Sequence, residues 1–88
     1  MHELQRLREV ETALRAQNFG EAARVLNLLD QEVPQGKMME ERDAAFVVTR
    51  CALGLGDRTR LARAFAADHP GSVYWERVHS RCEADDNK

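Results

Sequence analysis

The chain contains an internal repeat with a spacing of 39 residues: residues 13–18, Ala-Leu-Arg-Ala-Gln-Asn, are echoed at 52–57 as Ala-Leu-Gly-Leu-Gly-Asp. Each copy is followed by an alanine-containing amphipathic segment and then by a proline, Pro34 or Pro70. A self-similar spacing of this size is typical of stacked helical hairpins. The repeat therefore predicts an all-α fold of helix pairs rather than one irregular bundle.

The same spacing continues through the segment before each proline. Ala23-Arg24 corresponds to Ala62-Arg63, and Leu26 corresponds to Phe65. The interval from the repeated alanine to the proline is three residues shorter in the second copy, which is about one helical turn. We therefore expect a shorter second hairpin, followed by one helix that opens an unfinished third repeat.

Apolar residues at three- and four-residue steps predict five antiparallel helices. Asn18, Asp57 and Ser72 are suited to begin helices as N-caps, and Gly56 is suited to close the third helix in the left-handed conformation. The predicted helices cover about Glu3–Gln17, Asn18–Val33, Lys37–Leu55, Arg58–His69 and Ser72 onward.

The length of 88 residues supports one domain, and 43% hydrophobic with 32% charged residues is an ordinary globular composition. We expect a single helical domain over residues 1–84. It comprises a hairpin at 3–33, a second hairpin at 37–69 and a capping helix at 72–84. Residues 85–88 are expected to form a polar tail.

The formal net charge is −2, and the 13 basic and 15 acidic residues are interspersed. Without a basic block, a nucleic-acid backbone is not the favoured partner. Arg58, Arg60 and Arg63 are the residues on which a helical nucleic-acid-binding module would depend. No apolar run approaches the roughly 18 residues of a transmembrane helix, so membrane insertion is not expected.

The turn Gln17-Asn18-Phe19-Gly20-Glu21-Ala22 and the proline twelve positions after Ala22 make the chain similar to the tetratricopeptide repeat family, in a degenerate bacterial form. The resemblance covers about residues 3–82. It departs from the family at Gln17, where glycine is usual, in lacking an early large aromatic residue, and in its spacing of 39 rather than about 34.

The resemblance implies a right-handed α-α superhelix with a concave face lined by the first helix of each pair. It also implies a non-catalytic adaptor, scaffold or chaperone-like module that binds a peptide or helix of a partner protein. The residues with implied or expected structural roles are Phe19, Ala22, Leu26, Leu29, Pro34, Gly56, Phe65 and Pro70.

Polar residues on the first, third and fifth helices are the candidates for partner binding: Arg8, Glu11, Arg15, Arg42, Thr49, Arg50 and Arg77. The alternative is that they form ordinary solvated helix faces. Motifs for phosphate-loop, metalloprotease, serine-hydrolase or dithiol chemistry are missing from the sequence. We therefore expect neither an enzyme nor a cofactor.

Tyr74 and Trp75 are adjacent, so a helix directs them about 100° apart and at least one should be partly exposed. Such an aromatic residue serves either as an interface anchor or as a cap over the end of the repeat stack, and capping is favoured. A homodimer through this end is a further alternative, as expected of an oligomerisation domain in a larger bacterial regulatory or envelope protein.

The two cysteines, Cys51 and Cys82, can form a disulfide if the third and fifth helices pack side by side. A bridge indicates an oxidising compartment such as a periplasm, whereas two buried reduced thiols, which are slightly favoured, fit a cytoplasm. His79 and Cys82 lie three residues apart, and His69 lies in the preceding turn. They supply too few ligands at suitable spacing, so a metal site is not expected.

Overall fold

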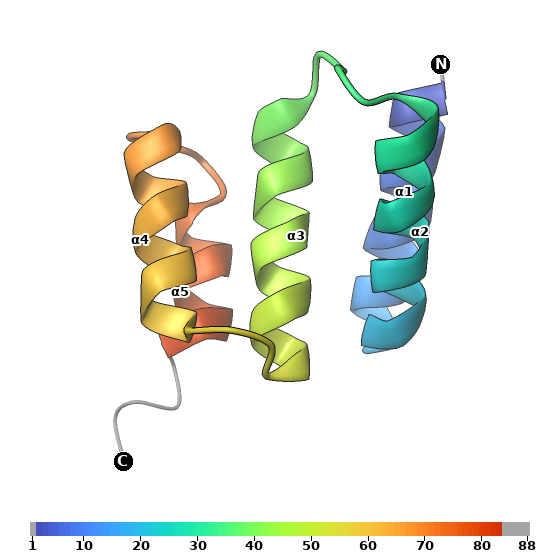
Figure 1. The fold of residues 1–88 in the computed structure, drawn as a ribbon. Coiled ribbons are helices and arrows are strands. Elements are labelled where there is room, and N and C mark those ends of the chain that lie inside the picture. Colours follow the sequence, from blue (N-terminus) through green and yellow to red (C-terminus); the bar gives the residue numbers. More distant parts are fainter. Residues whose placement is uncertain (1, 84–88) are drawn as a thin grey trace.

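The computed structural model describes residues 2–83, and within that range the chain is all-helical with no strand (Figure 1). The predicted all-α class with five helices is confirmed. The expectations for residue 84 and for the tail at 85–88 lie outside the described residues. The helices are α1 (His2–Arg15), α2 (Phe19–Glu32), α3 (Met39–Leu53), α4 (Arg58–Asp68) and α5 (Trp75–Glu83).

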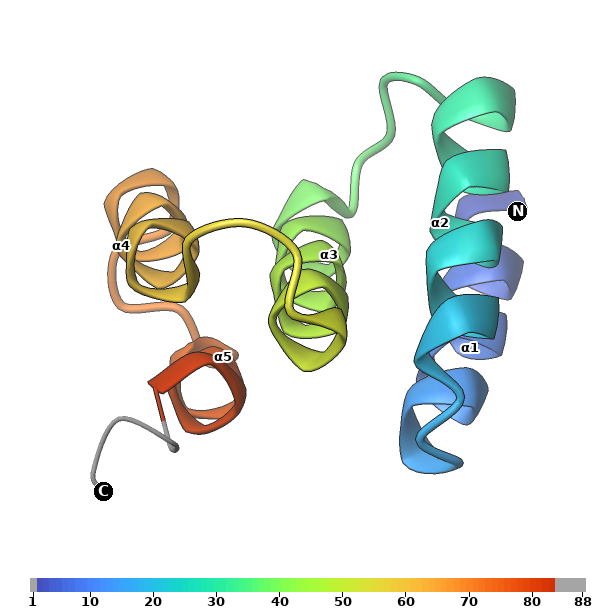
Figure 2. The ribbon, with the colours of Figure 1, turned by 60° about the horizontal axis from the view of Figure 1, so that its bottom comes forward.

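Helix α3 lies at the centre of the molecule, with α1 and α2 on one side and α4 and α5 on the other (Figures 1 and 2). Successive helices run in alternating directions (Figure 1). The apolar core has two parts. One gathers buried residues of α1, α2 and α3, and the other gathers those of α3, α4 and α5. Because α3 contributes to both, it joins the two halves.

The first helix of each hairpin ends in the same hydrogen-bonding pattern. Gln17 has φ 57° and Gly54 has φ 72°. In each case the next residue donates its N–H five positions back, from Asn18 to Ala13 and from Leu55 to the carbonyl of Arg50. This is the Schellman motif, in which a left-handed residue closes the helix. The predicted closure at Gly56 is therefore wrong.

The two closing residues are 37 positions apart rather than 39 because the second turn contains two additional residues, Leu55 and Gly56. The turns end at N-caps that are 39 positions apart. There the side chains of Asn18 and Asp57 accept hydrogen bonds from the N–H groups of Glu21 and Arg60, as predicted. The repeat in the sequence is therefore in register at the caps but not along the first helices.

The second hairpin is shorter, as predicted: α2 has 14 residues and α4 has 11. Both end at a residue of nearly identical backbone conformation that precedes proline. Val33 has φ −136° and ψ 73°, and His69 has φ −134° and ψ 67°. Pro34 and Pro70 themselves are exposed, so they terminate helices without entering the core.

Helix α5 begins at Trp75, later than predicted, because residues 72–74 form a turn. The Ser72 hydroxyl accepts a hydrogen bond from the N–H of Tyr74, and the Ser72 carbonyl accepts one from the N–H of Trp75.

Four of the residues with expected packing roles are buried: Ala22, Leu26, Leu29 and Phe65.

A buried carboxylate–guanidinium pair joins the start of α1 to the loop between α2 and α3. The Glu3 carboxylate accepts hydrogen bonds from the N–H groups of Lys37 (2.9 Å) and Met38 (3.1 Å) and from Arg42 (3.4 Å). Arg42 also donates to the Val33 carbonyl at 2.7 Å. Burial by itself raises the pKa of Glu3, but these hydrogen bonds outweigh it and hold the pKa below its usual value.

Arg42 is therefore not available to a partner, contrary to the expectation from the sequence. Its side chain is only 5% exposed, and its second terminal nitrogen donates to Asp30 at 2.8 Å. Thr49, also expected to bind a partner, is 2% exposed, and its hydroxyl donates to the Ala45 carbonyl. Both side chains are buried and already form hydrogen bonds within the protein.

Cys51 of α3 and Cys82 of α5 form a disulfide, with sulfur atoms 2.08 Å apart and Cα atoms 5.1 Å apart. Both residues are buried in the core between α3, α4 and α5. The slight preference for reduced thiols is thus not met in the structure, because α3 and α5 pack side by side and bring the two sulfurs together.

Gly36→Ala should destabilise the fold by about 2 kcal/mol, because a Cβ at this position would meet the Glu3 carboxylate and push it away from its donors. Gly20→Ala is the matched control. A Cβ at Gly20 meets nothing within 4 Å, and the change should stabilise α2 by about 0.5 kcal/mol. Urea unfolding measures the free energy of unfolding of both variants. Equal changes in the two would contradict the close approach of Gly36 to the Glu3 carboxylate.

Removing the disulfide with Cys51→Ala and Cys82→Ala should lower the free energy of unfolding by about 3 to 4 kcal/mol. The bridge closes a loop with a sequence separation of 31 residues and so restricts the unfolded chain. Thermal unfolding with and without reductant measures this effect. Reductant should lower the unfolding midpoint of the parent chain but not that of the double variant. An unchanged midpoint in the parent chain would show that no bridge forms.

Candidate functional site

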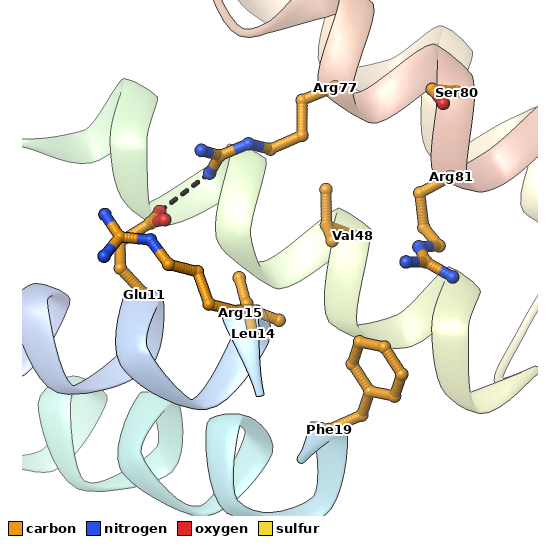
Figure 3. Close-up of a pocket in the computed structure, with 8 residues that line it drawn as sticks. All are labelled: Glu11, Leu14, Arg15, Phe19, Val48, Arg77, Ser80 and Arg81. Atoms are coloured by element: carbon orange, nitrogen blue, oxygen red, sulfur yellow. Dashed lines mark hydrogen bonds and ion pairs between the residues drawn. The ribbon is translucent and has the colours of Figure 1, made fainter. Parts of the chain in front are cut away.

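A groove runs between α1 and α5, with α3 along its floor, and it comprises two adjoining hollows of about 450 and 480 Å³. Figure 3 shows the first of them. The two hollows share Glu11, Arg15 and Arg77. The first is also lined by Leu14, Phe19, Val48, Ser80 and Arg81, and the second by Leu4, Leu7, Arg8, Thr12, Met38, Glu41 and Tyr74.

The groove has an apolar lining at several points along its length. Val48 of α3 and Leu14 of α1 line the first hollow, where Phe19 lies at the start of α2 (Figure 3). Leu7 and Met38 are among the apolar residues of the second. Apolar surface flanked by polar side chains is a common property of peptide-binding grooves.

One ion pair spans the groove. Arg77 of α5 donates to a carboxylate oxygen of Glu11 on α1 at 2.7 Å, although the two residues are 66 positions apart in the sequence (Figure 3). Both side chains are partly exposed, so the pair contributes little to stability, about 0 to 1 kcal/mol. Its importance lies in its position, because it connects the two walls.

The remaining arginines of the groove differ in their surroundings. The guanidinium of Arg81 lies 5.1 Å from the centre of the Phe19 ring, at the distance of a cation–π contact. Arg8 and Arg15 are exposed and form no ion pair with any residue in the range 2–83. The groove therefore presents positive charge that the described part of the chain does not neutralise.

The structure brings most of the sequence-derived binding candidates together. Five of them line the groove: Arg8, Glu11, Arg15, Tyr74 and Arg77. Arg50 does not. Its guanidinium lies 5.3 Å from the centre of the Phe46 ring, and Phe46 is exposed on α3.

Tyr74 and Trp75 are both half-buried and pack against the core between α3, α4 and α5. Tyr74 also lines the groove, whereas Trp75 does not and instead has its ring centre 5.3 Å from that of His79. The two adjacent aromatic residues therefore differ in their contacts, and only Tyr74 is placed to meet a groove occupant.

Phe19, expected to be a packing residue, lines the groove and is only half-buried. Ser80 and Arg81 were missed by the sequence reasoning. They follow Arg77 by three and four positions, so the helical spacing on α5 was a signal that could have found them.

His69 and His79 are each paired with a carboxylate. His69 lies 2.8 Å from Asp43, and His79 lies 3.0 Å from Glu83. The Asp43 carboxylate raises the pKa of His69 chiefly through this hydrogen bond. Across residues 2–83, no three side chains among His, Cys, Asp and Glu gather as metal ligands would.

Over the same described range, every helix is too short or too polar to cross a bilayer. No family model, curated protein or solved structure matches the chain. The resemblance to the tetratricopeptide repeat family therefore stays a prediction.

The phenol of Tyr74 should titrate above the usual tyrosine pKa of about 10. Burial raises its pKa most, followed by the negative charges of Glu41 and Glu40. A raised pKa in the folded chain contributes stability that is complete below the unfolded pKa and is lost as pH rises through the folded value. Tyr74 is the single tyrosine, so the ultraviolet absorbance of tyrosinate reports it alone.

In this titration, Glu41→Gln should lower the midpoint, because it removes one of the negative charges. Glu21→Gln on α2 should leave the midpoint where it is. An ordinary midpoint in the parent chain, or equal midpoints in the parent and Glu41→Gln, would contradict the surroundings described for Tyr74.

Proposed function

We propose that the chain is a non-catalytic protein–protein interaction module, an adaptor or scaffold of the tetratricopeptide-like type, which binds a peptide or helix of a partner protein in the groove. The observation that carries the proposal is the groove itself. Three helices that are distant in sequence supply one continuous lining of apolar and charged side chains.

A purely solvated helix face would account for the charges but not for their arrangement. The exposed Arg8 and Arg15 border a hollow with apolar residues such as Leu14 along it. Binding energy at protein interfaces comes mainly from apolar and aromatic contacts, with charged side chains around them setting specificity. Tyr74 and Phe19 supply the aromatic surface.

Peptides selected from a displayed library against the chain should shift the backbone amide NMR signals of groove residues on α1, α3 and α5. Ser80→Trp should weaken their binding at least about tenfold, since an indole at this exposed position fills the first hollow. Ala67→Trp, at an exposed position of α4 outside the groove lining, is the control and should leave affinity unchanged. If the selected peptides bound the Ser80→Trp variant with unchanged affinity, the binding site would lie outside the groove.

Homo-oligomerisation is the second candidate function. Met39, Phe46 and Leu53 recur at seven-residue intervals along α3, and each is about 40% exposed. Such a row on one helix face is suited to packing against a second copy. Light scattering coupled to size-exclusion chromatography tests this candidate, and a monomer at every concentration would contradict it. None of the three residues lines the groove, so a dimer through this row would leave the groove open.

We further propose an oxidising compartment, such as a periplasm, since the Cys51–Cys82 bridge persists only where thiols are not kept reduced. A nucleic-acid role is the least supported, although Arg60 and Arg63 are exposed on α4. Arg58 already donates to the Arg81 carbonyl at 2.9 Å, and the chain carries net negative charge. Binding to nucleic acid would show itself by a steep salt dependence.

A further inference from the structure

The groove has the opposite charge balance from the chain as a whole. The formal net charge of the protein is −2. The side chains that line the two hollows include four arginines, Arg8, Arg15, Arg77 and Arg81, but only two carboxylates, Glu11 and Glu41. Positive charge is therefore concentrated in the groove of an otherwise acidic protein.

The ion pair between Arg77 and Glu11 indicates which chemical group the groove is suited to hold. A carboxylate reaches from one wall to a guanidinium of the other at 2.7 Å, and the pair lies where the two hollows meet. Arg15 also lines both hollows there and has no carboxylate partner in the range 2–83. Guanidinium groups bind carboxylates through strong, charge-assisted hydrogen bonds.

We propose that the groove binds an acidic segment of a partner protein, and that a carboxylate of this segment replaces Glu11 at Arg77. The proposal rests on the proposed function of the groove as a binding site and adds the chemistry of the ligand. Arg8 and Arg15 receive further carboxylates, while apolar side chains of the segment pack on Leu14 and Val48. Glu11 is then an intramolecular competitor that occupies Arg77 in the unbound chain.

Three fluorescein-labelled peptides test the charge preference. They repeat the patterns Leu-Glu-Glu-Leu, Leu-Gln-Gln-Leu and Leu-Lys-Lys-Leu, so the first two are nearly isosteric and differ in charge, and the third reverses the charge. By fluorescence anisotropy, the acidic peptide should bind at least about tenfold more tightly than the glutamine peptide, and the lysine peptide should bind least. Raising the salt from about 50 to about 300 mM should weaken the acidic peptide most.

Two single substitutions test the competition at Arg77. Glu11→Gln should tighten binding of the acidic peptide about three- to tenfold, because it frees Arg77 and removes a negative charge. Arg77→Gln should weaken it about tenfold. A merely structural ion pair would not move affinity in opposite directions. The matched control is the exposed Glu21–Arg24 pair on α2, where Glu21→Gln and Arg24→Gln should change nothing.

Equal affinity for the acidic and glutamine peptides, with no effect of Glu11→Gln, would overturn the acidic preference while leaving peptide binding in the groove intact. Unchanged or weaker binding in Glu11→Gln would overturn the competition. Failure of the acidic peptide to bind at about 1 mM would overturn this proposal alone. A different result contradicts the proposed function itself: library-selected peptides that bind the Ser80→Trp variant as tightly as the parent chain.

Discussion

The pairing of Glu3 with Arg42 is the constraint on which the rest of the fold depends. Taking two charges out of water is costly, and a buried pair survives only when its remaining hydrogen-bonding groups are also satisfied. Here the carboxylate accepts two backbone N–H groups and the guanidinium donates to a backbone carbonyl and to Asp30. The first turn of α1, the loop after α2 and the start of α3 are consequently held in one arrangement.

That arrangement determines where the groove can form. The N-cap residue of α3, Met38, has no side-chain capping bond, and a carboxylate from α1 instead holds its N–H. The position of α1 beside α3 is thus fixed near the beginning of α3. At the other side, the bridge from Cys51 to Cys82 fixes α5 to the same helix. Both walls of the groove, α1 and α5, are therefore fixed in position relative to α3, which forms its floor.

Local sequence patterns were sufficient for the number of helices and for the ends of α2 and the start of α4, because the caps Asn18 and Asp57 and the proline after α2 act on their own neighbours. They were insufficient for Arg42, which lies on a helix where arginine is usually solvated. Its burial depends on a carboxylate 39 residues away. Arg77 of α5 was a candidate from the sequence, but its place opposite Glu11, 66 positions away, depends on how α1 and α5 pack around α3.

Because the disulfide is buried, its reduction can be used to measure how fast α5 separates from α3. Cys51 and Cys82 are 3% and 0% exposed, so a thiol reagent meets their sulfurs only after α5 has moved away from α3. Reduction under native conditions then proceeds no faster than this local separation, whatever the concentration of the reagent. At reductant concentrations high enough for this opening to limit the rate, the lifetime of the bond measures the motion of the helix that carries Arg77 and Arg81.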